Sequence, residues 1–331
     1  MNSLHGKETV AAESFESYEA LWQDFGSLPQ GGCLFVLPLW LKVWWDAFGG
    51  NMPPLLCRVL QGRTVLGMAP LMRQGDRAVF MGSPQVCDYF DFIMVPGRER
   101  GFVRGLIDYL KQLGIRSLEL NPVRSDSSVL TAFLPLAESL GCEGRCERVD
   151  VSVELDLPAT WDEFLHALTG KERHEVRRKI RRLEGAADVR LRVLEEPLAV
   201  AGEMDRFLHL MRLSRPEKEA FMTTGMAVFF RSLAEAMAEA RLVKLFFLDL
   251  DAQPAAAAFC FDHGGTVYLY NSGYDPRYGW LSAGLLNKVF SIRASIELGR
   301  HKYDFLKGAE VYKYRLGGRE VPLYRCQIGL A

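Results

Sequence analysis

The stretch from Tyr268 to Arg315 constrains the fold of this chain more than any other part of the sequence. It begins with a strand-like run rich in Tyr and Val, passes through a polar loop into a long amphipathic segment, and ends in a second strand, Tyr303–Leu306. Strand, helix and strand in this order predict a βαβ unit. The loop before the helix offers backbone N–H groups to anions, and open α/β sheets place their chemistry at strand ends. The loop before the helix and the end of the second strand are therefore candidate parts of a functional site.

An earlier copy of the same pattern predicts an internal repeat. In the first half a predicted helix ends at Gly114 and a strand begins four residues later, and in the second half the same spacing follows Gly299. Predicted meandering strands precede both helices, so we expect two related lobes. The expected divisions are an N-terminal lobe at 1–157, a basic helical hairpin at the lobe junction at 158–185, and a C-terminal lobe at 186–331.

Composition excludes several classes of protein. The 331 residues are 49% hydrophobic with a net charge of −1, which argues against wholesale disorder and against a general polyanion binder. The seven cysteines form no CxxC pair and no Cys/His cluster, which argues for a reducing compartment and against a disulfide framework or a zinc site. The longest apolar run, Cys33–Leu41, is too short to span a bilayer, and no signal-peptide pattern is present. We therefore expect a cytoplasmic protein without a metal or a transmembrane segment.

The predicted helix Lys171–Leu183 concentrates positive charge in an otherwise neutral chain. Its first twelve residues hold seven Lys or Arg against two Glu, and Arg177 and Arg181 lie one turn apart beside Arg178. Such a run is commonly a solvated face. It also suits a phosphate-bearing ligand such as a nucleotide, a lipid-linked sugar or a tRNA. The sequence leaves both interpretations open.

Several of these segments together resemble a known family. Lys171–Leu183, Tyr303–Gly308 and Tyr312–Arg315 look like the Fem-like subgroup of the GNAT acyltransferase superfamily, and Asp88–Asp91 and Trp40–Gly49 fit the same pattern. That subgroup includes proteins associated with cellulose and exopolysaccharide genes. The resemblance implies an α/β (α+β) fold of two tandem GNAT-like lobes, each a mixed, largely antiparallel sheet with flanking helices. It also implies transfer of an acetyl, acyl or aminoacyl group to an amine or hydroxyl of a cell-envelope or polysaccharide-related acceptor.

The donor site departs from the family pattern. GNAT enzymes that use acetyl-CoA usually carry Q/R-x-x-G-x-G/A, and the matching place here reads Arg277–Gly284, RYGWLSAG. Small residues at a helix start still suit a pyrophosphate. The expected donor is therefore acetyl-CoA or another acyl-CoA, with the aminoacyl-tRNA of Fem-type relatives as the alternative. The residues expected to bind it are Tyr278, Gly279, Ser282, Ala283 and Gly284.

Acyl transfer needs a base, donors for the oxyanion and an acid for the leaving group. Asp304 and Glu310, near the end of the second strand, are the candidate bases. Tyr270 and Tyr312 are candidate acids, although each residue type is more often packed in a core. The scattered histidines pair with no Cys or Ser in a recognisable arrangement, so we expect no covalent nucleophile.

Other polar side chains are candidates for binding the acceptor. Asp88 and Asp91 flank two aromatics at a predicted strand entrance, where acid–base work and turn capping are both plausible. The residues expected to bind substrate are Asp88, Tyr89, Asp91, Arg177, Arg178, Arg181, Lys307 and Lys313. The alternative function is a catalytically inactive GNAT-fold module that binds a phosphorylated or glycosylated partner. Nucleic-acid binding as the main function is disfavoured, because the net charge is near zero and we see no interleaved aromatic–basic platform.

Overall fold

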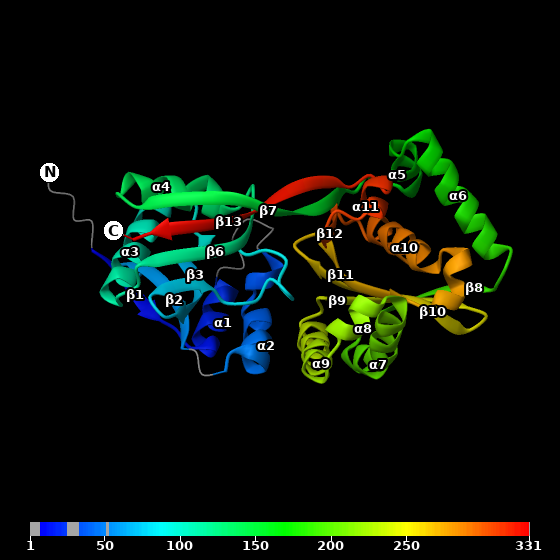
Figure 1. The fold of residues 1–331 in the computed structure, drawn as a ribbon, viewed down its shortest axis with the longest axis horizontal. Coiled ribbons are helices and arrows are strands. Elements are labelled where there is room, and N and C mark those ends of the chain that lie inside the picture. The colour runs from blue at the N-terminus through cyan, green and yellow to red at the C-terminus, as the bar shows by residue number, and fades with distance from the viewer. Residues whose placement is uncertain (1–6, 25–32, 51–52, 331) are drawn as a thin grey trace. The chain divides into compact units, whose positions relative to one another are not determined.

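The computed structural model describes residues 7–24, 33–50 and 53–330 (Figure 1). The chain forms two compact units, of which the first is Met1–Val151 with Val321–Ala331 and the second is Ser152–Glu320. The first boundary falls after Val151 and not after residue 157, residues 158–185 belong to the second unit, and the end of the chain also differs from the expected division. Residues 321–331 belong to the first unit because the last strand pairs with a strand of that unit.

The first unit is built on a sheet that is antiparallel at most of its pairings. Its strands lie in the order β1 (Glu8–Ala12), β2 (Pro54–Gln61), β3 (Thr64–Gln74), β4 (Arg77–Phe80), β6 (Ser117–Arg124), β13 (Arg319–Gly329) and β7 (Glu143–Asp156), with β5 (Ile93–Met94) paired to β3. The β4–β6 pair is parallel. A crossover helix joins these two strands, as parallel neighbours require.

The helices of the first unit bury apolar stripes. They are α1 (Phe15–Asp24), the 3₁₀ turn η1 (Leu34–Val36), α2 (Pro38–Phe48), α3 (Glu99–Gln112), the π turn η2 (Val129–Phe133) and α4 (Leu134–Ser139). In α2 a proline occupies the first turn and Trp40 and Trp44, four residues apart, are buried, as the 3.6-residue period requires. In α3 the buried positions include Phe102 and Leu106.

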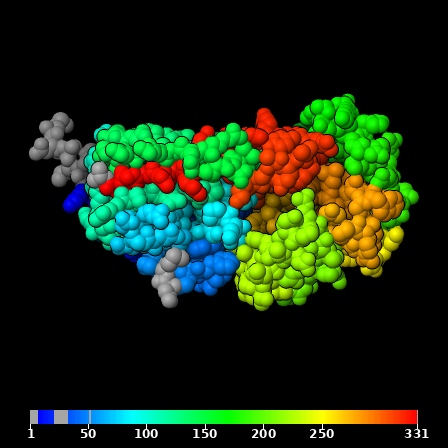
Figure 2. Space-filling view, viewed as in Figure 1, coloured from blue at the N-terminus to red at the C-terminus, as the bar shows by residue number. Residues whose placement is uncertain are grey.

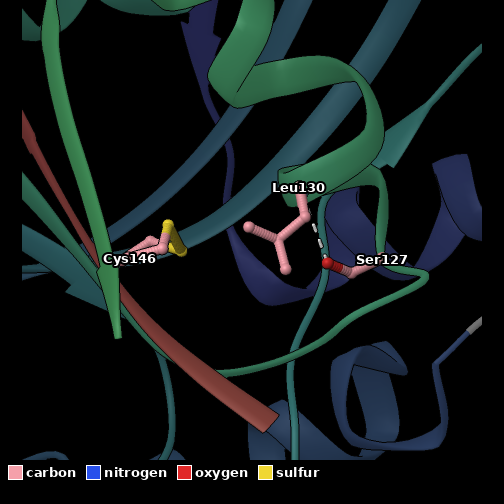
Figure 3. The surroundings of a disulfide bond; sticks show 4 residues. Ser127, Leu130 and Cys146 are labelled. Atoms are coloured by element: carbon pink, nitrogen blue, oxygen red, sulfur yellow. Dashed lines mark hydrogen bonds between the residues drawn. A yellow bond between two sulfur atoms is a disulfide. The ribbon is translucent and has the colours of Figure 1, made fainter. Parts of the chain in front are cut away.

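A disulfide joins Cys146 of β7 to Cys326 of β13 (Figure 3). The expectation that the chain has no disulfide is therefore wrong for this pair. The two cysteines are 180 residues apart, and they meet because β7 and β13 are neighbours in the sheet. In the same view Ser127 Oγ accepts a hydrogen bond from the Leu130 N–H at 3.4 Å. The other five cysteines are free thiols.

The second unit contains strands of mixed direction. The strand order continues from β7 through β12 (Lys302–Lys307), β11 (Thr266–Tyr274), β10 (Gln253–His263) and β9 (Val243–Leu250) to β8 (Val189–Leu194) in the same hydrogen-bonded sheet, and only Ser152–Asp156 of β7 belong to the second unit. All pairings are antiparallel except β11–β12. Every residue of β9 is buried, as expected for an inner strand covered on both faces.

Helices cover both faces of this sheet. They are α5 (Trp161–Ala167), α6 (Gly170–Glu184), α7 (Pro197–Ser214), α8 (Pro216–Phe221), α9 (Thr224–Glu239), the 3₁₀ turn η3 (Pro276–Leu281), α10 (Ala283–Glu297) and α11 (Val311–Arg315). Figure 1 shows α7, α8 and α9 on one side of the sheet and α10 on the other. Thr160 and Glu163 form the predicted capping box of α5, and Thr169 accepts the N–H of Glu172 at the start of α6.

The internal repeat predicted from the sequence is confirmed by the pairing of the strands. In the first unit α3 connects the parallel strands β4 and β6, and in the second unit α10 connects the parallel strands β11 and β12. Gly114 and Gly299 follow the two helices with φ of 73° and 69°, the left-handed conformation that glycine adopts without a Cβ clash. Each unit is therefore a mixed, largely antiparallel sheet with flanking helices, as expected.

Candidate functional site

A pocket of about 290 Å³ opens at the start of α10 in the second unit. Its lining comes from α10, η3, the end of β11, α11 and the residue before α8. The lining residues are Arg215, Tyr274, Gly279, Ser282, Ala283, Gly284, Leu285, Lys288 and Tyr312. Four of the five residues expected to bind the donor therefore line one pocket, together with one of the expected acids. Tyr278 is not among them, and its ring lies beneath the guanidinium of Arg277 at 5.9 Å.

The backbone at the pocket is held by local interactions. Asp275 caps η3, since its carboxylate accepts the Arg277 N–H at 2.9 Å and binds the Arg277 guanidinium. Ser282 then adopts a left-handed conformation, with φ of 60°, and α10 begins at the next residue. The first N–H groups of a helix have no acceptor within the helix. The start of α10 therefore presents positive partial charge to the pocket.

The absence of a side chain at Gly284 allows the start of α10 to lie close to Tyr274. A Cβ at Gly284 would lie 2.9 Å from a ring carbon of Tyr274, closer than ordinary contacts allow. Any larger side chain there would displace Tyr274 or enter the pocket.

Lys288 is a pocket residue that the sequence analysis missed. Its Nζ donates to the Gly284 carbonyl at 3.0 Å and lies 5.2 Å from the centre of the Tyr312 ring. Burial lowers the pKa of Lys288 to about 8, and the charges of Arg215 and Lys313 contribute to the same shift. Its position one turn into α10, four residues after a glycine, is the only sequence signal that pointed to it.

Tyr312 is half-buried, and its ring faces the ammonium group of Lys288. Burial raises the pKa of its phenol, and the negative charge of Glu310 raises it further. The phenol is therefore protonated at neutral pH and has a proton to donate.

Glu310 is the residue before α11, and it is not among the residues that line the pocket. Burial would raise the pKa of its carboxyl, but the hydrogen bond and charge of Lys313 outweigh burial and lower the pKa. Glu310 is therefore ionised at neutral pH and able to accept a proton. It also lies close enough to Lys288 to influence the pKa of that residue.

Lys313 has a different position from the one expected for a substrate-binding residue. Its side chain is buried, and Nζ donates to the carbonyls of Leu306, Lys307 and Gly308 at 2.9, 2.8 and 3.0 Å. This geometry favours a structural role at the turn after β12. The side chain of Lys307 is half-buried at the end of the same strand.

The remaining catalytic candidates lie outside the lining of this pocket. Asp304 is buried, and Oδ1 accepts hydrogen bonds from Ser152 Oγ at 3.1 Å and from the Leu306 N–H at 2.7 Å. Tyr270 packs among aromatic rings, with the centre of the Phe230 ring at 5.4 Å. Both arrangements favour structural roles, while the roles expected from the sequence stay predictions.

Lys218 is a second lysine that the sequence analysis missed, and its charge interacts with those of Lys288 and Arg215. Lys218 of α8 donates to Asn271 Oδ1 at 2.8 Å and to the carbonyl of Ser272. Burial lowers the pKa of Lys218 to about 7, with contributions from the charges of Lys288 and Arg215.

The basic helix α6 contacts the start of α10. Lys179 Nζ donates to Ser282 Oγ at 2.7 Å, and the Arg182 guanidinium lies 5.6 Å from the centre of the Trp280 ring. Figure 2 shows the green surface of α5 and α6 beside the orange surface of η3 and α10. The expected substrate-binding residues of this helix, Arg177, Arg178 and Arg181, are exposed, and Arg178 pairs with Glu175 at 2.8 Å.

The aspartate cluster expected to bind substrate lies in the first unit. Asp91 accepts the N–H groups of Phe92, Ser128 and Val129 and the hydroxyl of Ser128, so it caps η2. This is the capping interpretation that the sequence left open. Burial raises the pKa of Asp91 to about 6 against these hydrogen bonds.

The two neighbours of Asp91 in the cluster also have defined environments. The buried ring of Tyr89 lies beneath the Arg124 guanidinium, at 5.1 Å, and contacts Phe35. Asp88 is half-buried.

Within residues 7–24, 33–50 and 53–330, no three His, Cys, Asp or Glu side chains are arranged to hold a metal ion. Across those same ranges no helix combines the length and apolar character needed to cross a membrane.

Comparisons with known proteins find one family model, which matches within the second unit. Residues 170–314 match the model of the acetyltransferase (GNAT) domain. A search of curated proteins finds no match.

Solved structures match over nearly the whole chain. FemX is 13% identical with a TM-score of 0.66, covering 96% of both chains. A tandem GNAT protein from the clavulanic acid biosynthesis pathway is 12% identical with a TM-score of 0.50, covering 97% of this chain and 98% of its own. The C-terminal domain of a protein described as a lysylphosphatidylglycerol synthetase, from Agrobacterium fabrum, is 11% identical with a TM-score of 0.56, covering 87% and 90%. At these identities the similarity shows the fold, which is a tandem GNAT-like architecture.

Proposed function

We propose that this chain is an acyltransferase that binds its acyl donor in the pocket at the start of α10. The observation that carries the proposal is that this pocket brings the helix start together with Tyr312 and Lys288. An acyl-CoA donor combines a pyrophosphate with a thioester. The N–H groups at the start of α10 suit the pyrophosphate, and Lys288 and Arg215 add positive charge to the same pocket.

The side chains at the pocket suit the proton transfers of the reaction. An acceptor amine attacks the thioester carbonyl carbon, a C–N bond forms, and the C–S bond breaks. Tyr312 donates its phenolic proton to the departing thiolate, and the carboxylate of Glu310 takes the proton from the attacking nitrogen, directly or through water. A hydroxyl acceptor would lose its proton along the same route. Lys288 stabilises the negative charge that develops near the phenol.

The acceptor that we propose is a cell-envelope or polysaccharide-related molecule, carrying an amine or a hydroxyl. The resemblance of the sequence to Fem-like transferases supports this class, and the exposed cations of α6 suit a lipid-linked or phosphorylated acceptor. An aminoacyl-tRNA is the alternative donor.

Thermal shift with coenzyme A and acyl-CoAs tests the donor site. A ligand at a hundred times its dissociation constant adds about 2.7 kcal/mol of stability, which raises the melting temperature by several degrees. We expect Gly284→Val to abolish the shift, because the new side chain meets Tyr274 or fills the pocket. Gly202→Val is the matched control, since a Cβ at Gly202 meets nothing within 4 Å. An equal shift in wild type and Gly284→Val would rule out this pocket as the donor site.

A non-catalytic binding module is the second candidate. It is favoured by the positions of Asp304, Tyr270 and Glu310, three of the four expected catalytic residues, which do not line the pocket. Release of free thiol from acyl-CoA, measured with an amine or hydroxyl acceptor present to take the acyl group, distinguishes the two functions. An acyltransferase releases thiol and loses this release in Tyr312→Phe, whereas a binding module binds the donor and releases none.

A further inference from the structure

Trp280 is a large apolar side chain that the fold holds in solvent. It lies in η3 between Gly279 and Ser282, two residues of the pocket lining, and 62% of its surface is exposed. The turn that carries it is well fixed, because Asp275 caps its start and the next residue, Leu281, is buried. The exposure is therefore a property of the folded turn and not of a loose loop. An exposed aromatic beside a pocket is a common contact for a ligand that extends out of it.

Two basic residues of α6 lie at or near this ring. The Arg182 guanidinium lies over the ring, and within the described part of the chain Arg182 forms no ion pair. Three residues earlier on the same helix, Lys179 binds Ser282 Oγ at the rim of the pocket. Helix α6 carries seven Lys or Arg against three Glu, a balance of 7 − 3 = +4. An aromatic face with adjacent cations suits a flat base that is attached to phosphate.

We infer that Trp280, with Arg182 and Lys179, forms a platform that binds the adenosine-phosphate end of the acyl donor outside the pocket. The base stacks on the exposed indole, and Arg182 and Lys179 face the phosphate groups. This inference rests on the proposed function in one respect, that the pocket receives the reactive end of the donor. Coenzyme A and the 3′ end of an aminoacyl-tRNA both supply an adenosine with phosphate, so both sources fit the platform.

Calorimetric titration with two ligands isolates the contribution of the base. Coenzyme A carries the adenosine phosphate, and 4′-phosphopantetheine lacks it. We expect wild type to bind coenzyme A more tightly, and Trp280→Ala to weaken that binding about tenfold or more while leaving 4′-phosphopantetheine affinity unchanged. Arg182→Gln should weaken coenzyme A binding by a smaller factor that grows at low salt.

Two control variants match these substitutions. Trp161→Ala removes another tryptophan of this unit that has an arginine, Arg293, over its ring at 5.9 Å, but Trp161 does not line the pocket. Lys171→Gln removes an exposed positive charge from the first turn of α6. Neither control should change coenzyme A affinity. If Lys171→Gln lowered the affinity for coenzyme A as much as Arg182→Gln does, the change would follow from the net charge of α6 alone. That result would overturn the role of Arg182.

The outcomes separate the platform from the donor pocket. Equal affinities of wild type for the two ligands, or unchanged coenzyme A binding in Trp280→Ala, overturn the platform and leave the proposed function standing. If wild type binds neither ligand but binds adenosine 3′,5′-bisphosphate in a Trp280-dependent way, the platform stands and the acyl-CoA donor is wrong. Competition of the bisphosphate with a tRNA acceptor stem then identifies tRNA as the source. Absence of binding to the bisphosphate, coenzyme A and tRNA overturns the platform altogether.

Discussion

Oδ1 of Asp304 accepts a hydrogen bond from the backbone N–H of Leu306 at 2.7 Å, two residues further along β12. Leu306 is buried with φ of 62°, a left-handed conformation that costs a leucine about 1 kcal/mol or more. The same oxygen accepts from Ser152 Oγ. The carboxylate therefore fixes the turn from which Glu310 and Tyr312 follow.

Asp304→Ala should lower the free energy of unfolding by about 1–3 kcal/mol, because the Leu306 N–H and the Ser152 hydroxyl lose their acceptor. Asp304→Asn keeps an acceptor oxygen and should retain both fold and turnover. Urea unfolding and a turnover assay of the two variants check this. Loss of turnover in a fully folded Asp304→Asn protein would instead make Asp304 a catalytic residue.

Tyr312→Phe should reduce kcat about 100-fold, because the leaving group loses its proton donor, while the dissociation constant of the donor stays unchanged. The matched control is Tyr314→Phe on the same helix, whose hydroxyl binds Glu320 at 2.8 Å away from the pocket lining. The control should keep full kcat. Equal kcat values for wild type and Tyr312→Phe would exclude the phenol as the acid.

Lys218 should make stability depend on pH in the alkaline range. Burial holds its folded pKa at about 7, below the ordinary value of 10.5, helped by Lys288 and Arg215 and opposed by Glu310. Between these values the unfolded chain binds more protons than the folded chain, so the stability of wild type rises with pH. The gain is at most about 1.4 kcal/mol per pH unit.

Urea unfolding of wild type and Lys218→Met at pH 6.5 and 9 checks this dependence. The advantage of wild type over the variant should increase with pH, whereas exposed Lys171→Met should track wild type. Parallel pH profiles for wild type and Lys218→Met would show that the lysine titrates normally.

Asp91→Ala should destabilise the first unit by about 2 kcal/mol or more, since the start of η2 loses the carboxylate that caps it. Asp126→Ala is the comparison, because Asp126 is exposed and binds Arg124 near the same turn. That variant should cost less than about 1 kcal/mol. Thermal or urea unfolding of both variants measures the difference, and equal small losses would contradict the capping role of Asp91.

The disulfide predicts the number of free thiols. Thiol titration of the denatured, unreduced protein should find five thiols, and seven after reduction. Cys146→Ser should lower the free energy of unfolding by about 2–5 kcal/mol, because the bond closes a long loop in the unfolded chain. Cys260→Ser is the control for loss of a free thiol. Seven thiols before reduction would show that the bond is absent.

The sequence predicted the elements better than it predicted the site. Sequence patterns located α3 and α6, because the pattern of a helix is a local signal. The βαβ unit and its small-residue loop located the start of α10 and most of the pocket lining. The short helix α8 was missed, because six residues contain too little periodicity to detect.

The features that the sequence did not predict depend on contacts between residues that are far apart in the chain. Lys288, Arg215 and Lys218 have ordinary sequence surroundings, and only the packing of α8, α10 and α11 brings them near one pocket. Arg182 and Trp280 are far apart in the sequence, yet they meet from separate elements. Cys146 and Cys326 meet only because their strands are neighbours in the sheet.

The place of β13 in the sheet affects how the protein is made. This strand lies between β6 and β7 in the sheet, but in the chain it follows all the strands of the second unit. When the ribosome has released residues 1–151, the first unit still lacks an inner strand, and β6 and β7 keep exposed edges that invite pairing with other chains. The first unit is therefore complete only after the second unit has been synthesised.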